Sequence, residues 1–131
     1  MLFRSLKTTD GGITWTAQTS GVTNDLRSVY FTDANNGWVV GIGGTVLKTT
    51  DGGTSWQKIT GVASSDLYSI SFADANNGIM AGTGKIYITT NGGATWVDES
   101  PTFSGDIYAT TSSGVAISWA VGQGGLIFKR S

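Results

Sequence analysis

The sequence contains no cysteine and no histidine, and it has a single proline among its 131 residues. Without cysteine the chain has no disulfide, no thiolate metal ligand and no cysteine nucleophile. Without histidine it has neither a histidine-based catalytic triad nor a histidine-ligated metal site. These absences exclude whole classes of hydrolase and metalloprotein.

Charged residues are also scarce, at 13% of the chain, and the formal net charge is −1. Proteins that bind nucleic acid usually concentrate Lys and Arg, so we expect no nucleic-acid partner. No stretch approaches the ~18 consecutive apolar residues of a membrane span, so none is predicted. Residues 1–5 do not read as a secretory signal, because Arg4 interrupts the apolar run and no long apolar segment follows.

Glycine, by contrast, is abundant, with 20 residues, and it recurs in an eight-residue turn that appears three times. The copies span residues 8–15, 49–56 and 89–96 and read TTDGGITW, TTDGGTSW and TTNGGATW. Asp or Asn followed by Gly-Gly is a strong turn signal, because the side chain bonds nearby N–H groups and glycine allows positive φ. We expect each copy to join two antiparallel strands, with its Trp anchoring the hairpin on the layer beneath.

The similarity between the copies extends over a unit of about 40 residues. Each unit reads as four short strands, A to D, in which strand A starts with an aspartate and strand B is apolar on both faces. The expected strands are A at 25–31, 66–72 and, more weakly, 106–112; B at 38–41, 79–82 and 119–122; C at 45–48, 85–88 and 126–129; and D at 55–60 and 95–99. In the first strand A, alternation places Val29 and Phe31 on one face and Leu26 on the other.

Four short antiparallel strands in a unit of this length are typical of one blade of a β-propeller. We therefore predict an all-β fold of about three four-stranded blades in a single domain, 1–131. The units cover approximately 2–19 (partial), 25–60, 66–100 and 105–130 (partial). Closed propellers have ~4–8 blades, so one chain is not expected to close a ring. Either the chain is part of a longer propeller, or two copies form a six-bladed ring in which residues 2–19 of one complete the last blade of the other.

The three turns resemble the Asp-box, or BNR, repeat, whose pattern is Ser/Thr-x-Asp-x-Gly-x-Thr/Ser-Trp. The residues at its fixed positions are Asp10, Gly12, Trp15, Asp51, Gly53, Trp56, Asn91, Gly93 and Trp96. The third unit departs most, because Asn91 replaces the Asp and residues 112–118 lack the Asp-Ala-Asn-Asn-Gly turn of 33–37 and 74–78. The whole unit is most similar to the photosystem II assembly and stability factor type of propeller.

That resemblance implies a structural role for the Asp-box residues and a scaffold that binds a protein partner. It also implies an extracellular, periplasmic or thylakoid-lumen-like location, although the chain itself shows no signal peptide. Related repeats occur in sialidases, in xyloglucan-degrading glycosidases and in sortilin-type receptors. The resemblance is therefore more specific for the fold than for an activity.

The acidic residues give little support to an enzyme. Seven of the nine occupy repeat positions, where Asp caps a turn or starts strand A, and only Asp98 and Glu99 fall outside. A glycosidase needs two carboxylates flanking the scissile bond, and Glu99 has no evident second member. The spacing of Arg4, Arg27 and Arg130 does not match the arginine cluster of sialidases. We expect no catalytic residue, no metal site and no cofactor, since Asp-Gly-Gly also lacks the ligand spacing of a calcium loop.

The positions that vary between units are better candidates for function. Arg27, Tyr68 and Tyr108 occupy the same place near the start of strand A, which lines the central channel of a propeller. Both residue types are favoured in contact sites, because they combine apolar area with a polar tip. We predict a recognition patch at the channel mouth, although exposed Tyr and Arg are also common as ordinary surface residues.

Three functions remain open on this basis. The first is a non-enzymatic binding or assembly scaffold for a protein partner, with self-association into a homodimeric ring. The second is a carbohydrate-binding, lectin-like module that holds a glycan on Trp or Tyr platforms between blades. The third is a fragment of a sialidase or other glycoside hydrolase whose catalytic residues lie outside these 131 residues.

Overall fold

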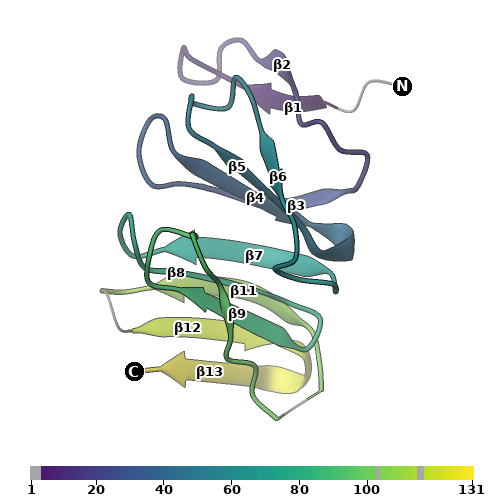
Figure 1. The fold of residues 1–131 in the computed structure, drawn as a ribbon, viewed down its shortest axis with the longest axis vertical. Coiled ribbons are helices and arrows are strands. Elements are labelled where there is room, and N and C mark those ends of the chain that lie inside the picture. The colour runs from purple at the N-terminus through teal and green to yellow at the C-terminus, as the bar shows by residue number, and fades with distance from the viewer. Residues whose placement is uncertain (1–3, 103, 115–116) are drawn as a thin grey trace.

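The computed structural model describes residues 4–102, 104–114 and 117–131. They form antiparallel sheets that stack one after another along the long axis, with the first and last strands at opposite ends of the stack (Figure 1). The all-β propeller prediction is confirmed, in the form of an open run of blades. Residues 2 and 3 of the expected first unit, residue 103 of a linker, and 115 and 116 of the third A–B connection lie outside the described residues.

The described residues form four sheets. The first contains β1 (Arg4–Lys7) and β2 (Thr16–Thr19). The second is ordered β3 (Leu26–Phe31), β4 (Gly37–Gly41), β5 (Thr45–Thr49) and β6 (Gln57–Ile59). The third is ordered β7 (Leu67–Phe72), β8 (Gly78–Gly82), β9 (Lys85–Thr89) and β10 (Val97–Asp98). The fourth contains β11 (Ile107–Ser112), β12 (Ser118–Gly122) and β13 (Leu126–Arg130).

The three Asp-box turns join β1 to β2, β5 to β6 and β9 to β10 as antiparallel hairpins. The outer strands are shorter than the sequence predicts, since β10 contains only Val97 and Asp98 instead of residues 95–99. The reason is local: the backbone N–H of Thr95 bonds the side chain of Asn91 at 3.0 Å and stays in the turn. Two of the three glycine turns between strands B and C form single 3₁₀ turns, η1 (Ile42–Gly44) and η2 (Gln123–Gly125), whereas the turn at Gly84 does not.

Each inner strand has a register shift near its start, and a glycine of the neighbouring strand lies opposite. In β3 the pairing passes from Leu26–Gly41 to Ser28–Val40, which leaves Arg27 as the extra residue. A Cβ atom at Gly41 would collide with the carbonyl oxygen of Asp25, so only glycine fits there. The same shift and the same clash recur at Gly82 in the third sheet and at Gly122 in the fourth.

This bulge changes which face the first residue of the strand occupies. Strict alternation predicts that Leu26 lies opposite Val29 and Phe31, but Leu26 lines the same groove as both. In the third sheet, Leu67 likewise belongs to one buried cluster with Ile70 and Phe72. The prediction from alternation is therefore wrong at this position, because one extra residue shifts the phase of the side chains.

Two apolar cores lie between successive sheets. The first joins β3–β6 to β7–β10, and its buried members are Trp38, Val40, Val46, Leu67, Ile70, Phe72, Met80 and Tyr87. The second joins β7–β10 to β11–β13, and its buried members are Ile79, Ala81, Ile86, Ile88, Ile107 and Ala120. Each sheet thus buries both faces only where it has a neighbour on both sides, which leaves the outward faces at the two ends of the stack exposed.

Candidate functional site

The three predicted recognition residues lie at the bulges of the three inner strands. Arg27, Tyr68 and Tyr108 are the extra residues in β3, β7 and β11, and these strands run side by side in successive sheets. A bulge re-aims a side chain relative to the regular strand, so one backbone device positions all three residues. The carbonyl oxygen one or two residues before each bulge accepts a backbone N–H from the B–C turn, for example Ile42 N to Asp25 O at 2.9 Å.

The structure brings two of these residues into contact. The rings of Tyr68 and Tyr108 lie with their centroids 5.9 Å apart and their planes tilted by 41°. The hydroxyl of Thr83 donates to the Tyr68 hydroxyl at 3.2 Å, while Tyr108 keeps 54% of its surface exposed. Arg27 is exposed and forms an ion pair with Asp25 at 3.4 Å. The result is an aromatic pair in which Tyr108 is exposed and Tyr68 is half-buried, with a separate cation on the neighbouring strand.

Hydroxyl groups tie the inner strands together beside this patch. The Ser28 hydroxyl accepts the backbone N–H of Ile70 at 3.3 Å. The Ser69 hydroxyl, one repeat later, accepts the N–H of Thr110 at 3.0 Å and also contacts the Thr110 hydroxyl at 2.9 Å. The edges of neighbouring sheets are thereby held at a fixed spacing, so the positions of Tyr68 and Tyr108 are fixed relative to each other.

The Asp-box aspartates serve as turn caps. The Asp51 carboxylate accepts the Ser55 hydroxyl at 2.6 Å, the Ser55 backbone N–H at 2.9 Å and the Thr49 hydroxyl at 2.8 Å. Bonds of this kind lower the pKa of Asp51, and likewise of Asp10, to about 2. Asn91 occupies the same place with an amide, which bonds both the backbone and the hydroxyl of Thr95.

The turns between strands A and B use aspartate in a second way. Asp33 accepts the backbone N–H groups of Asn35 at 2.7 Å and Asn36 at 2.8 Å, and Asp74 does the same in the next repeat. The Asn36 amide and these N–H groups hold the pKa of Asp33 below its ordinary value. Each of these carboxylates is occupied by its own turn, which leaves it poorly placed for acid–base chemistry.

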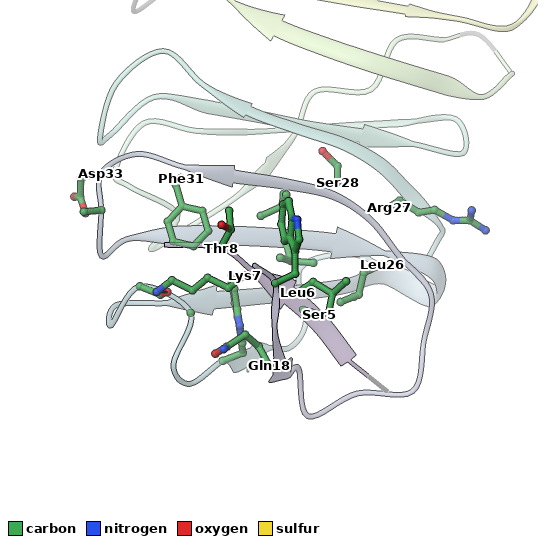
Figure 2. Close-up of a pocket in the computed structure, with 17 residues that line it drawn as sticks. Ser5, Leu6, Lys7, Thr8, Gln18, Leu26, Arg27, Ser28, Phe31 and Asp33 are labelled. Atoms are coloured by element: carbon green, nitrogen blue, oxygen red, sulfur yellow. Dashed lines mark hydrogen bonds between the residues drawn. The ribbon is translucent and has the colours of Figure 1, made fainter. Parts of the chain in front are cut away.

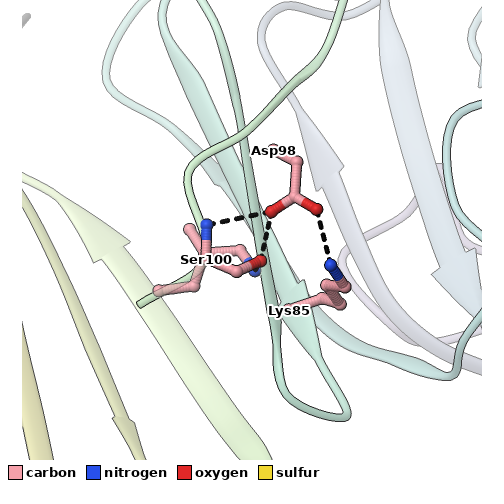
Figure 3. A network of polar contacts seen from close by, with 4 residues as sticks. Lys85, Asp98 and Ser100 are labelled. Atoms are coloured by element: carbon pink, nitrogen blue, oxygen red, sulfur yellow. Dashed lines mark hydrogen bonds and ion pairs between the residues drawn. The ribbon is translucent and has the colours of Figure 1, made fainter. Parts of the chain in front are cut away.

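Polar contacts outside the repeat pattern lie within the third sheet and between the third and fourth sheets. Lys85 donates to Asp98 at 2.6 Å, and the Ser100 hydroxyl and backbone N–H bond the same carboxylate (Figure 3). These bonds, with Lys85 as the main cause, lower the pKa of Asp98 to about 2. Glu99 receives two bonds from Arg130, at 2.7 and 3.1 Å. Both acids that the repeat did not explain are therefore partners of basic residues.

A groove of about 660 Å³ separates the β1–β2 hairpin from the sheet β3–β6 (Figure 2). Its floor is apolar and includes Leu26, Val29, Phe31 and Val39. Its walls come from the hairpin, from Trp56 and from the Asp-box glycines 52 and 53. The guanidinium group of Arg27 points away from the centre of the groove in Figure 2. Arg27 itself lies at the edge of the groove, so the predicted patch and the groove meet at this residue of β3.

The sequence reading did not identify this groove, although one signal for it was present. Phe31 and Trp56 repeat as Phe72 and Trp96, and this second pair is covered by Trp38 of the preceding sheet. The repetition of this aromatic pair was the available signal, whereas the covering of each copy depends on how the sheets are stacked.

Two kinds of feature are absent from the described residues. No group of three or more His, Asp or Glu side chains in that part of the chain is arranged to hold a metal ion. Within the same residues, no helix has the length and apolar character needed to cross a membrane.

Comparison with known proteins places this architecture in a family. Among solved structures, YCF48 bound to a D1 peptide shares 29% sequence identity at a TM-score of 0.73, over 82% of this chain and 37% of that chain. YCF48 from Cyanidioschyzon merolae has a TM-score of 0.80 at 18% identity, over 97% of this chain and 44% of that one. An ancestral GH74 enzyme has a TM-score of 0.74 at 22% identity, over 95% of this chain and 19% of that one.

The two likenesses below 25% identity are likenesses of fold alone. No curated protein matches the chain significantly. The chain spans 37% and 44% of the lengths of the two YCF48 structures. A family model described as photosynthesis system II assembly factor YCF48 matches residues 6–131, which is nearly the whole sequence. The resemblance inferred from the Asp-box turns is thus confirmed, and the chain belongs to the photosynthesis system II assembly factor YCF48 family.

Proposed function

We propose that this chain is a non-enzymatic binding scaffold for a protein partner. The observation that carries the proposal is its 29% identity, over 82% of its length, to a YCF48 that was solved with a bound D1 peptide. The placement of the acidic residues supports it, because the Asp-box and A–B turn carboxylates cap their own turns and Asp98 and Glu99 pair with basic side chains. The GH74 likeness concerns the fold.

The contact site that we propose is the patch formed by Arg27, Tyr68 and Tyr108. An aromatic pair with one exposed ring offers apolar area at a low entropic cost, and a cation on the neighbouring strand selects an acidic or carboxylate-bearing segment. The three bulges hold these side chains on rigid inner strands, which limits the ordering required on binding.

Peptide titration calorimetry would test this function, with the D1 peptide as the probe. We expect the Arg27→Ala and Tyr68→Ala variants to lose at least tenfold in affinity. Arg27→Ala should keep a melting temperature close to the wild-type value, whereas Tyr68→Ala should melt a few degrees lower because it loses the contact with Tyr108. Lys58→Ala is the control, because Lys58 is an exposed cation on β6, the outer strand of the second sheet. No binding by the wild-type chain would overturn the peptide-partner proposal, and unchanged binding by both variants would overturn the proposed site.

We further propose that two copies associate, so that the units at approximately 2–19, 25–60, 66–100 and 105–130 together build a six-bladed ring. The two end sheets support this, because the described residues supply two strands at one end and three at the other. Both ends also expose large apolar side chains, including Trp15 at 58% and Ile127 at 70%. A solution mass of twice 13.6 kDa is expected, and a clean monomer at all accessible concentrations would contradict the ring.

A further inference from the structure

The junction between the second and third sheets shows how one sheet of this chain docks onto the next. Its docking face, defined as Trp38, Val40, Val46 and Lys48, lies on β4 and β5. Trp38 stacks on Phe72 at 6.0 Å, meets Trp96 edge-on at 5.8 Å and lies against Gly93. Lys48 lies 4.8 Å above the Trp38 ring and donates to the carbonyl oxygen of Gly92 at 3.5 Å.

The third sheet receives this docking face, and the second sheet carries a similar receiving face that no docking face covers among the described residues. On the third sheet the receiving face consists of Leu67, Ile70, Phe72 and Met80. The equivalent residues one repeat earlier are Leu26, Val29, Phe31 and Val39, which form the floor of the groove. Trp56 meets Phe31 edge-on at 6.0 Å, just as Trp96 meets Phe72 at 5.9 Å. In place of a covering tryptophan there is open space, and Val29 is 59% exposed.

The docking face also has an uncovered copy, at the other end of the stack. Trp119, Val121, Ile127 and Lys129 occupy the same strand positions as the docking face on β4 and β5, and in the same register. Lys129 lies 5.5 Å above the Trp119 ring, which repeats the Lys48–Trp38 arrangement. Trp38 is 2% exposed, whereas Trp119 is 38% and Ile127 is 70% exposed.

We infer that the sheet β11–β13 of a second copy docks into the groove of the first, with Trp119 of the second copy filling the space beside Phe31, Gly53 and Trp56. This inference rests on the self-association proposed above and identifies the contact between the two copies that would form the dimer. The occupant is a second copy because its docking face repeats, residue by residue, the face that the same receiving surface binds within the chain.

For this joint to form, strand β1 must be displaced, because it already pairs with β2 in the third strand position. We infer that β13 of the second copy replaces β1. The buried apolar position of Val46, at 0% exposure, is filled by Ser5 in β1 but by Ile127 in β13. Leu6 of β1 is 61% exposed, so few apolar contacts hold that strand. Lys129 would then take over the Gly52 carbonyl, which Lys7 now contacts at 2.7 Å.

The test is sedimentation equilibrium of the full chain and two variants, Val29→Glu in the groove and Trp119→Ala on the docking face. We expect the wild type to dimerise and each variant to raise the dimer dissociation constant at least tenfold. Val97→Glu is the matched control, because Val97 is 58% exposed on a strand away from both faces and should not change the mass. An equimolar mixture of the two variants should regain dimer, since one intact joint remains possible.

The outcomes separate this inference from the proposals it rests on. A wild type that stays monomeric contradicts self-association itself, whereas dimers that persist in both variants show that another surface is used and overturn the joint. Binding of the D1 peptide is measured independently on Val29→Glu, so that the scaffold function is judged separately. For the exchanged strand, Lys129→Ala should weaken the dimer and Lys7→Ala should not, and the reverse result would overturn the replacement of β1. Circular dichroism confirms folding of each variant.

Discussion

The indole ring of Trp38 lies so close to Gly93 that a Cβ atom at residue 93 would collide with it. Gly93 is the second glycine of an Asp-box turn, and Trp38 belongs to the preceding sheet, so the contact joins two blades. Gly93 also has a φ of 78°, which L side chains rarely adopt. The fixed glycine of the Asp-box therefore serves the turn and the packing between blades at once.

Gly93→Ala is expected to lower the free energy of unfolding by about 3 kcal/mol, from the left-handed φ together with overpacking against Trp38. Gly11→Ala is the control, because Gly11 has a similar φ of 72° and a Cβ atom added there would have no neighbouring atom within 4 Å. Gly11→Ala should lower the free energy of unfolding by about 1 kcal/mol, from backbone strain alone. Urea unfolding measures both values, and equal losses would contradict the packing role.

The Asp-box carboxylates should make stability depend on pH in the acid range. The folded pKa of Asp51, about 2, lies below its ordinary value of 3.8, so its stabilisation is present above about pH 4 and is lost as the pH falls through 2. Asp51→Asn should therefore reduce the drop in melting temperature between neutral and acid pH. Asn91→Asp should enlarge it by adding a third titrating box. Melting curves at several pH values measure this, and slopes unchanged in both variants would contradict it.

The contact between Tyr68 and Tyr108 should couple their contributions to stability. A double-mutant cycle with Tyr68→Ala and Tyr108→Ala is expected to give a coupling energy of about 1 kcal/mol, as for other tilted aromatic pairs. Repeating the cycle with Tyr68→Ala and Lys58→Ala provides the control, and its coupling should be close to zero. A coupling near zero for the tyrosine pair would mean that the rings do not hold this arrangement in solution.

The Glu99–Arg130 pair is expected to give a small, salt-sensitive stabilisation between the third and fourth sheets. It is bidentate and only partly exposed, with side-chain exposures of 39% and 28% for Glu99 and Arg130. Glu99→Gln should cost about 0.5–1 kcal/mol at low salt and less at high salt. Asp25→Asn is the control, because the Asp25–Arg27 pair is a single 3.4 Å contact with Asp25 75% exposed. A larger loss for Asp25→Asn would contradict this ranking.

Much of the fold could be predicted from the sequence, because the repeat carries its own local signals. Asp and Gly-Gly fix each hairpin by hydrogen bonds that lie within eight residues, as in the bonds from Thr49 and Ser55 to Asp51. The candidate site was predicted less completely. Tyr68 and Tyr108 could be aligned by repeat position, but their contact depends on how far one blade is rotated from the next, which no local pattern encodes.

The sequence by itself determined the all-β blades, their turns and the absence of cysteine and histidine chemistry, since these depend on residue type and short-range bonding. Only the tertiary structure decided which repeated faces are covered. Trp38 and Trp119 occupy the same position of their repeats, yet one is buried and the other exposed, because among the described residues a following sheet packs against the first and none packs against the second. Burial depends on neighbours that are distant in sequence, so the groove at β3 and the uncovered face of β12–β13 emerged only when the sheets were stacked.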